Sequence, residues 1–320
     1  MKSINKLLCS TAALLACAAA HAADYPNRPI KLVVNSSPGA LMDVTARLVT
    51  QQMSEKLGQP IVVENRAGAD GLIGIRYVKG QPADGYTILV SANTVAQLPA
   101  FKKDPGYTLK DFTPIGMIIR TAYLMVGPPS QPAKTVAEFV KEAKASPGKL
   151  SVASAGVGTS THMAAALFMQ QAGIQLLHVP YKGNAAALPD VMGGRVNILF
   201  DGGNTSGPAV KDGQLRAFGV TSPKRMAAFP DVPTLAEQGL PNYDFYAYHT
   251  LLAPAGTPPA VIARLSEALQ EAVRTPAVQE RLRLDGSEAW GLTPAQTGEF
   301  LGEDYLRTVK VVRDLGLPRD

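Results

Sequence analysis

Apolar runs rich in β-branched residues alternate with segments of helical periodicity along most of the chain. Runs of this kind predict buried strands, and they occur at 30–34, 61–63, 87–90, 122–126, 150–153, 176–179, 196–200, 216–220 and 245–252. Apolar residues spaced three and four apart predict helices, at 41–57, 72–79, 136–145, 161–171, 185–192, 206–211, 261–274, 277–284 and 294–314. This alternation favours an α/β protein with mostly parallel sheets.

Two such strand–helix series in a chain of 320 residues predict two lobes. The Pro-rich stretch at 127–129 is the candidate crossing from one lobe to the other, and the loop at 253–259 lies near the return. A chain of this size can bury a core large enough to fold without disulfides or metals.

The first residues predict secretion. Lys2 and Lys6 precede an apolar stretch at 7–20, and the segment 20–22 places alanine at the two positions that a signal peptidase reads. The stretch is shorter than the roughly 20 apolar residues that a membrane span needs. We therefore expect 1–22 to be a signal peptide and the remaining chain to be periplasmic.

Both cysteines of the sequence, Cys9 and Cys17, lie inside this predicted signal peptide. The remaining chain therefore has no disulfide, no thiolate nucleophile and no cysteine-based metal site. The segment 14–17 loosely fits a lipoprotein box with Cys17 as the acylated residue. The apolar region continues beyond it, which favours cleavage without a lipid anchor.

The charge of the chain argues against a nucleic-acid partner. Its 31 basic and 26 acidic residues give a formal net charge of +5, which falls to +3 without the two lysines of the signal peptide. No basic stripe is interleaved with aromatic residues. A mildly positive surface is compatible with an anionic ligand, and equally with ordinary surface scatter.

Two loops between a predicted strand and a predicted helix are candidate anion sites. The first reads Ser-Ser-Pro-Gly-Ala (36–40) and the second reads Ser-Ala-Gly-Val-Gly-Thr-Ser (154–160). A helix N-terminus leaves backbone N–H groups unpaired and favours anions, although either loop could be an ordinary turn. The second loop lacks the last glycine of GxGxxG and no GK[ST] follows, so nucleotide binding is weakly supported. One loop per lobe suits a ligand held between the lobes.

The histidines outside the signal peptide, His162, His178 and His249, do not predict a metal site. No pair has the spacing of helical ligands and no HExxH occurs, and no cofactor is expected. Ser160 and His162 are two residues apart, so they point to different helix faces. There is also no GxSxG elbow, which argues against a hydrolase. We expect His162 to cap the loop or touch a ligand, and His178 to be a structural strand residue.

Two acids and two tyrosines complete the candidates. Asp201 directly follows a predicted strand, where α/β proteins bind ligands, although it could equally start a turn. Asp43 lies one turn into the first predicted helix, where its carboxylate could interact favourably with the helix dipole or contact a ligand. Tyr246 and Tyr248 share one strand face, so they are either core residues or a wall of the pocket.

Eight motifs spread over nearly the whole chain resemble the substrate-binding proteins of tripartite tricarboxylate transporters, also called the Bug family. They are YPNRPI (25–30), GQPIVVENR with Gly68 (58–68), ADGYT (83–87), PGKL (147–150), SAGVGT (154–159), HVPYKG (178–183), VTS (220–222) and LAPAGTP (252–258). They occur in the family's order, and together they are highly specific.

The resemblance implies a two-lobed periplasmic binding protein fold, type II-like, with a ligand cleft between the lobes. Lobe 1 would combine 24–125 with 250–320, and lobe 2 would span 126–249. It implies a small carboxylate ligand and membrane subunits of a tripartite tricarboxylate transporter as partners. No enzymatic activity is expected, and the oligomeric state stays open, with a monomer as the default for a shuttle. The ligand-binding residues expected from loops and motifs are Ser36, Pro38, Gly39, Ala40, Asp43, Ser91, Asn93, Ser154, Gly156, Thr159, His162 and Asp201.

The chain departs from the family at the first loop, where the family usually reads FPPGGGTD and this sequence reads SSPGALMD (36–43). The loss of glycines narrows backbone freedom. These departures leave open whether the ligand is a di- or tricarboxylate or an aromatic carboxylate. Two other classes also stay open: a ligand-sensing receptor module, and a secreted hydrolase using Ser160 or the pair Asp43 and Asp201.

Overall fold

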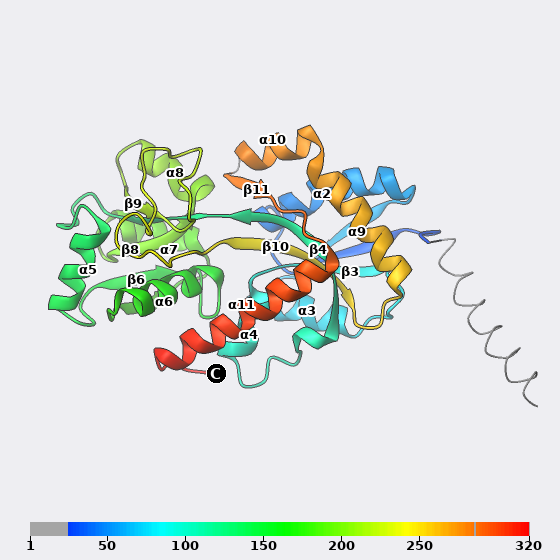
Figure 1. The fold of residues 1–320 in the computed structure, drawn as a ribbon, viewed down its shortest axis with the longest axis horizontal. Helices are drawn as coiled ribbons and strands as arrows, with labels where there is room; N and C mark the ends of the chain where they lie inside the picture. Colours follow the sequence, from blue (N-terminus) through cyan, green and yellow to red (C-terminus); the bar gives the residue numbers. More distant parts are fainter. Residues whose placement is uncertain (1–24, 285, 320) are drawn as a thin grey trace, which may run out of the picture.

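The computed structural model describes residues 25–284 and 286–319, which form two α/β lobes (Figure 1). The strands are β1 (Ile30–Val34), β2 (Ile61–Asn65), β3 (Thr87–Ala92), β4 (Phe112–Thr121), β5 (Tyr123–Gly127), β6 (Ser151–Ser154), β7 (Leu177–Pro180), β8 (Ile198–Gly202), β9 (Arg216–Val220), β10 (Ala247–Pro254) and β11 (Ser287–Ala289). The helices are α2 (Leu41–Leu57), α3 (Leu72–Lys79), α4 (Thr94–Phe101), α5 (Val136–Ala145), α6 (Ser160–Ala172), α7 (Asn184–Met192), α8 (Gly203–Lys211), α9 (Pro259–Arg274), α10 (Pro276–Leu284) and α11 (Pro294–Asp314). Two short 3-10 turns are η1 (Ala69–Gly71) and η2 (Leu109–Asp111). The predicted signal peptide lies outside the described residues.

The two sheets have matching strand orders. The first lobe holds a six-stranded sheet in the order β11-β4-β10-β3-β1-β2, and the second holds a five-stranded sheet in the order β9-β5-β8-β6-β7. In each sheet the first of the three parallel strands, β1 or β6, lies between the other two. A strand from a crossing segment, β10 or β5, then separates β3 from β4 in the first sheet and β8 from β9 in the second. The inserted strands, β10 and β5, belong to the segments that cross between the lobes.

The prediction of mostly parallel sheets is wrong, because both sheets are mixed. Strands β1, β2 and β3 pair in parallel, as do β6, β7 and β8. Strands β4, β5, β9, β10 and β11 pair antiparallel with their neighbours. The crossing segments explain this difference: β4 leads into β5 with only Ala122 between them, β10 returns, and each inserted strand runs against its neighbours.

Three elements have no counterpart among the predicted ones, namely α4, β4 and β11. Pro99 lies inside α4, while Pro114 and Gly116 interrupt the apolar run of β4. Strand β11 has only three residues. These segments therefore contain no uninterrupted apolar pattern that would predict a helix or a strand.

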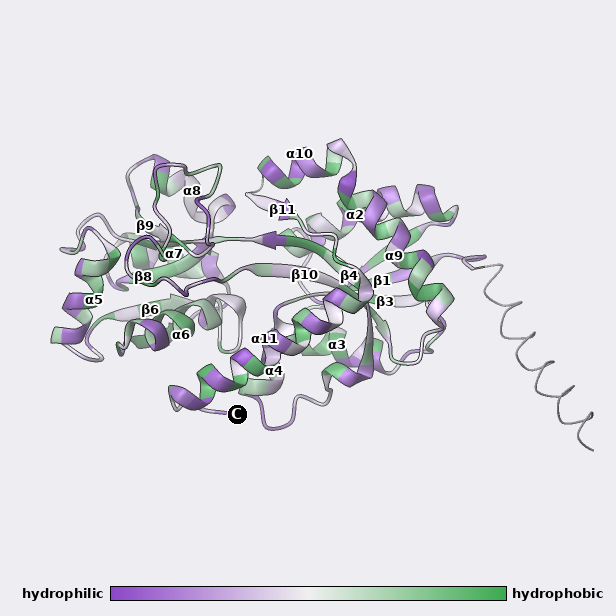
Figure 2. Cartoon of the chain, in the orientation of Figure 1, coloured by the Kyte–Doolittle hydropathy of each residue, from purple (hydrophilic) through white to green (hydrophobic). Residues whose placement is uncertain are grey.

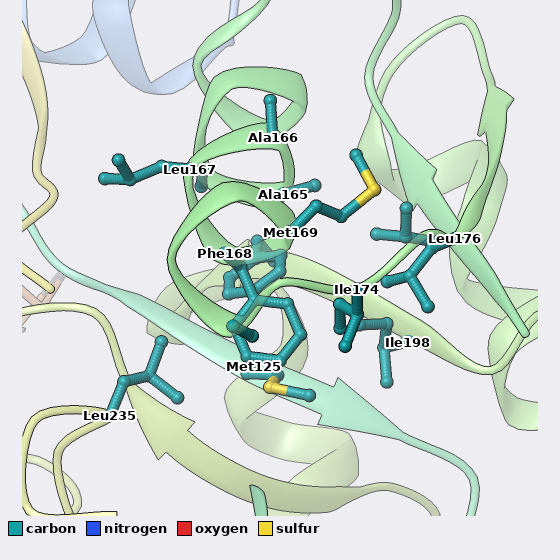
Figure 3. Close-up of a cluster of buried hydrophobic side chains, with 14 of the residues drawn as sticks. Met125, Ala165, Ala166, Leu167, Phe168, Met169, Ile174, Leu176, Ile198 and Leu235 are labelled. Atoms are coloured by element: carbon teal, nitrogen blue, oxygen red, sulfur yellow. The ribbon is translucent and has the colours of Figure 1, made fainter. Parts of the chain in front are cut away.

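Helices cover both faces of each sheet. In the first lobe α2, α9 and α10 bury one face, and α3, α4 and α11 bury the other. In the second lobe α5 and α6 cover one face, and α7 and α8 cover the other. Figure 2 shows the alternation of green and purple turns along α9 and α11 that such one-sided packing requires. Figure 3 shows Phe168 of α6 above Met125 of β5, both fully buried in the core of the second lobe.

Helix α11 contributes to both lobes, and Figure 1 shows it running beneath them in red. Leu301, near its start, belongs to a core cluster of the first lobe, whereas Val311 and Val312 pack into the core of the second. The buried carboxylate of Asp304 accepts hydrogen bonds from Gln97 of α4 (3.2 Å) and from the Tyr248 hydroxyl of β10 (2.9 Å). One side of the lobe boundary is therefore packed. None of the helices in the described residues is long and apolar enough to span a membrane.

Candidate ligand-binding site

Loops that follow the parallel strands of the two lobes approach each other at the lobe boundary. Carboxyl ends of parallel strands share one edge of a sheet, which is where α/β proteins place their ligands. A Cβ atom added to Gly156 of the second lobe would lie 3.7 Å from Oδ1 of Asp70 in the first lobe. We name the segments 36–40, 68–71 and 154–160 the interlobe site.

The N-terminus of α2 offers free backbone donors to this site. Its N-cap residue is Ala40, which has no side-chain oxygen to cap the helix. Gly39 donates its N–H to Oδ2 of Asp43 (2.9 Å), but the N–H groups of 41–43 have no acceptor within the described part of the chain. Unpaired N–H groups at a helix N-terminus carry partial positive charge and favour an anion.

Asp43 fixes the shape of this first loop. The residue is 3% exposed, and its carboxylate accepts hydrogen bonds from Asn65 Nδ2 (2.9 Å) and Arg47 Nε (3.1 Å). Burial opposes ionisation of Asp43, but the hydrogen bonds from Arg47, Gly39 and Asn65 outweigh it and lower the pKa. The ionised carboxylate thus holds the loop against α2 and is already surrounded by protein donors.

Two other residues of the first loop are Ser36, whose hydroxyl is unpaired in the described part of the chain, and Pro38, which is exposed. The Ser36 hydroxyl is buried without a hydrogen-bond partner among the described residues, while its carbonyl accepts from Asn65 Nδ2 (3.2 Å). Ser36 Oγ therefore has unused hydrogen-bonding capacity at the base of the first loop.

Ser91 and Asn93 are fully buried at the end of β3. Asn93 accepts the N–H of Tyr248 through Oδ1 (2.9 Å) and donates through Nδ2 to the carbonyl of Tyr246 (3.1 Å). Ser91 Oγ accepts a hydrogen bond from Asn35 Nδ2 (3.1 Å). These contacts fix the point where β10 returns to the first lobe and leave little capacity for a ligand.

The second loop, 154–160, satisfies most of its own donors. Three of its N–H groups donate to nearby side chains: Ala155 to Thr161 Oγ1 (2.8 Å), Gly156 to Ser154 Oγ (3.1 Å) and Gly158 to His162 Nδ1 (3.1 Å). Thr159 caps α6 by accepting the N–H of His162, and donates its hydroxyl to the carbonyl of Gly156 (2.7 Å). The first loop, not the second, thus has the more open donor set.

A stacked pair of histidines supports the second loop. The ring of His162 lies parallel to that of His178, with centroids 4.0 Å apart, and 5.1 Å from the ring of Phe101 in α4. Burial, and then the neighbouring His178, lowers the pKa of His162 to about 3, and burial also lowers the pKa of His178. Both rings are therefore neutral at pH 7, which allows them to stack and His162 to accept from Gly158.

A serine–histidine pair also occurs beneath the loop, but not the one considered from the sequence. Ser154 Oγ lies 2.6 Å from His178 Nε2. Strands β6 and β7 are parallel neighbours in which His178 pairs with Val152, two residues before Ser154, so His178 and Ser154 are diagonal neighbours. Ser154 is fully buried, and no described carboxylate hydrogen-bonds to His178. Ser160 instead pairs with the hydroxyl of Tyr123 (2.7 Å). The pair supports the loop and offers no accessible nucleophile.

Asp201 lies at the carboxyl end of β8 and is 2% exposed. It accepts hydrogen bonds from Asn184 Nδ2 (2.6 Å) and from the hydroxyl of Ser206. Burial raises the pKa of Asp201 despite these hydrogen bonds. The Oδ1 atom of Asn184 is buried without a partner among the described residues, so this cluster has an unused acceptor.

The two tyrosines of the returning segment have separate environments. Tyr248 is core, with its hydroxyl on Asp304, whereas Tyr246 precedes β10 and stacks beneath the guanidinium of Arg120 at 4.7 Å. Tyr246 lines a hollow of about 290 Å³ together with Arg120 and Lys224. That hollow adjoins β11, at the far edge of the sheet from β1 and β2, so it is distinct from the interlobe site.

The predicted binding residues occupy two kinds of position. Ser36, Pro38, Gly39, Ala40, Ser154, Gly156 and Thr159 lie in the loops of the interlobe site, and of these Ser154 is fully buried. Buried positions, bonded within the protein, hold Asp43, Ser91, Asn93, His162 and Asp201.

Sequence reasoning missed Asp70, Asn35 and Asn184. An Asp-Gly dipeptide at 70–71 is a turn signal that could have drawn attention to Asp70. Among residues 25–284 and 286–319, no group of three or more His, Cys, Asp or Glu residues is placed to hold a metal ion.

Known sequences that are similar to this chain include a family model and several related proteins. The family model described as the tripartite tricarboxylate transporter family receptor matches residues 45–317. A protein of Pseudomonas sp. strain P51, encoded in the tcbD-tcbE intergenic region, is 37% identical over 290 residues, covering 90% of this chain and 86% of its own. Protein BugT of Bordetella pertussis is 33% identical over 295 residues, covering 91% and 90%.

Solved structures agree with these relatives. The R. palustris protein Rpa4515, solved with adipate, superposes with a TM-score of 0.81 at 32% identity, covering 92% of this chain and 99% of its own. MatC of Rhodopseudomonas palustris, solved with malate, gives a TM-score of 0.78 at 30% identity, covering 90% and 100%.

The two-lobed fold superposes on the periplasmic binding protein BugD with a TM-score of 0.79 at 30% identity, covering 92% of this chain and 100% of that one, and this confirms the predicted periplasmic binding protein fold. Within that class, the chain belongs to the tripartite tricarboxylate transporter receptor family, and its similarity to BugT places it with the Bug type.

Proposed function

We propose that this receptor is an extracytoplasmic solute-binding protein that captures a small carboxylate in the interlobe site and delivers it to the membrane subunits of a tripartite tricarboxylate transporter. It works without catalysis or cofactor, as a periplasmic monomer. The ligand is a di- or tricarboxylate or an aromatic carboxylate.

The observation that carries this proposal is the uncapped N-terminus of α2 in the interlobe site. Three N–H groups without acceptors, at 41–43, and the unpaired hydroxyl of Ser36 form a donor set for a carboxylate. No lysine or arginine is needed, because the helix end itself carries partial positive charge. The adipate and malate bound to two structural neighbours have the same chemistry.

The proposed binding residues play two roles. Ser36, Pro38, Gly39, Ala40, Gly156 and Thr159 would surround the ligand. Asp43, Ser91, Ser154 and His162 would hold those loops in place through the hydrogen bonds described above. Asn93 and Asp201 would instead support the neighbouring segments, through β10 and through Asn184.

Binding would draw the lobes together. Lobe 1 comprises 24–125 with 250–320 and lobe 2 comprises 126–249, and closure of one onto the other would create the shape that the membrane subunits recognise. The signal peptide, 1–22, would be removed on export.

A thermal-shift screen of the chain from Ala23 onwards tests the proposal. The panel contains aliphatic and aromatic mono-, di- and tricarboxylates, with sugars and neutral amides as controls. A ligand at about a hundred times its Kd should add about 2.7 kcal/mol to the free energy of unfolding. Shifts confined to carboxylates are expected. Shifts produced only by the controls would overturn the carboxylate assignment, and consumption of the ligand would reveal an enzyme.

A further inference from the structure

A run of four residues with positive φ carries an unpaired carboxylate into the interlobe site. The φ values are 119° at Gly68, 48° at Ala69, 57° at Asp70 and 92° at Gly71. Residues other than glycine adopt this left-handed conformation at an energetic cost, which is smaller for aspartate than for alanine. Backbone strain of this kind concentrates at ligand clamps and other functional positions.

Asn35 holds this turn beside the first loop. Its Nδ2 donates to the carbonyl of Gly71 (3.4 Å), and a Cβ atom added to Gly71 would lie 2.5 Å from the same nitrogen. Asn35 directly follows β1 and leads into the loop 36–40 that ends at the N-terminus of α2. The turn that carries Asp70 therefore packs against Asn35, the residue that leads into the loop 36–40.

Asp70 faces the second lobe with its carboxylate unused. A Cβ atom on Gly156 would lie 3.7 Å from Asp70 Oδ1 and also 3.7 Å from the carbonyl oxygen of Tyr181. Two acceptors, one of them charged, therefore flank the same point. The Asp70 side chain is exposed, and it has no hydrogen bond or ion pair with any other described residue.

We infer that Asp70 is the specificity-determining residue of the interlobe site and selects a carboxylate that also carries an ammonium group. The inference rests on the proposed function, since it assigns the ligand's carboxylate to the N–H groups of α2. Asp70 and the carbonyl of Tyr181 then receive the ammonium group between the lobes. A ligand with a second carboxylate alone would bring like charge to Asp70 and be disfavoured.

A direct ion pair across the boundary is the competing role for Asp70. Lys182 follows Tyr181, is exposed, and takes part in no ion pair within the described segments. A pair between Asp70 and Lys182 would tie the lobes together and affect all ligands alike. A role in selecting an ammonium group affects only ligands that carry one.

Titration calorimetry with three ligands on one carbon skeleton separates these roles: succinate, malate and aspartate. We expect the unmodified protein to bind aspartate at least about tenfold more tightly than succinate. Asp70→Asn, which retains the tendency toward positive φ, should remove this preference and leave succinate affinity equal or higher. Asp70→Gly serves as a second variant, and Asp231→Asn removes an exposed charge outside the interlobe site as the matched control.

Three results would overturn the inference while leaving the proposed function standing. The first is equal affinity for succinate and aspartate in the unmodified protein. The second is an equal drop in affinity for all three ligands in Asp70→Asn. The third is an affinity for malate as high as that for aspartate. If none of the three ligands binds and the wider carboxylate panel also fails, the proposed function falls and the inference with it.

Discussion

The polar residues that support the interlobe site do so as neutral or hydrogen-bonded side chains. His162 accepts the N–H of Gly158 and stacks on His178, which in turn contacts Ser154. Protonation of His162 would remove its acceptor nitrogen and place charge in a buried stack. The second loop therefore depends on neutral imidazoles.

This dependence predicts a loss of stability in acid. The pKa of His162 is lowered from 6.5 to about 3, so below pH 6.5 the unfolded chain takes up a proton that the folded chain does not. Its contribution to stability is complete above that pH and falls by about 1.4 kcal/mol per pH unit further down. Urea unfolding at pH 7 and pH 5 should show that the free energy of unfolding falls less between these two pH values in His162→Gln than in the unmodified protein. An unchanged fall would contradict the role assigned to His162, and His249, with a pKa lowered to about 4, offers a comparison.

Ala69 makes a second prediction at this scale. It is an alanine at φ 48°, where left-handed conformation costs about 1–2 kcal/mol and glycine is nearly free of that cost. Ala69→Gly should raise the free energy of unfolding by about 1 kcal/mol, measured by urea denaturation. Ala67→Gly, an exposed neighbour without positive φ, is the control and should destabilise slightly. Destabilisation by both substitutions to the same extent would argue against strain at Ala69.

Among the helices, α2 differs from α5, α6 and α11 at its start. Threonine side chains cap those three helices, at Thr135, Thr159 and Thr293, whereas α2 begins at Ala40 without a cap. A missing cap costs stability, typically about 1 kcal/mol. Helices α3, α4, α7, α8 and α9 also start without a side-chain cap, so the missing cap by itself does not distinguish α2. At α2 the free N–H groups border the loop 36–40 of the interlobe site.

The cap position therefore predicts opposite changes in stability and binding. Ala40 has extended backbone angles suited to an N-cap, so Ala40→Ser should stabilise the protein by about 1 kcal/mol. The new hydroxyl would accept an N–H group that the ligand needs, and carboxylate affinity should fall roughly tenfold. Thr135→Ala, at a cap outside the interlobe site, should lose stability without changing affinity. Calorimetry and urea unfolding measure both effects, and unchanged affinity in Ala40→Ser would place the ligand elsewhere.

Elements with uninterrupted patterns were predictable from the sequence, and those shaped by tertiary contacts were not. The strand at 30–34 and the helix at 294–314 appear with the predicted bounds, because each has a clear apolar period. The left-handed turn at 68–71 has no local signal of that strength, since Asn35 stabilises it from outside the segment. The pairing of Ser154 with His178 depends on the register of β6 and β7, which no single segment encodes.

At the scale of the whole molecule, the two lobes are joined by crossing strands on one side and share packed helices on another. Helix α11 enters both cores, and the side chain of Leu98 in α4 would lie 2.9 Å from a Cβ atom on Gly158 of the second lobe. Motion of one lobe against the other must therefore pivot about this packed side.

Such a pivot predicts a modest compaction on binding. If the lobes close over the ligand as proposed, small-angle scattering of the chain with a saturating carboxylate gives a smaller radius of gyration than the chain alone. A sugar that produces no thermal shift is the control. An identical radius with and without a verified ligand would exclude closure as the signal to the transporter.

The most direct test of the carboxylate site is a crystal structure of the protein with the best carboxylate from the screen. We expect carboxylate oxygens within hydrogen-bond distance of the N–H groups of 41–43 and of Ser36 Oγ, between the loops 36–40 and 154–160. A ligand bound instead in the hollow lined by Arg120, Lys224 and Tyr246 would contradict it.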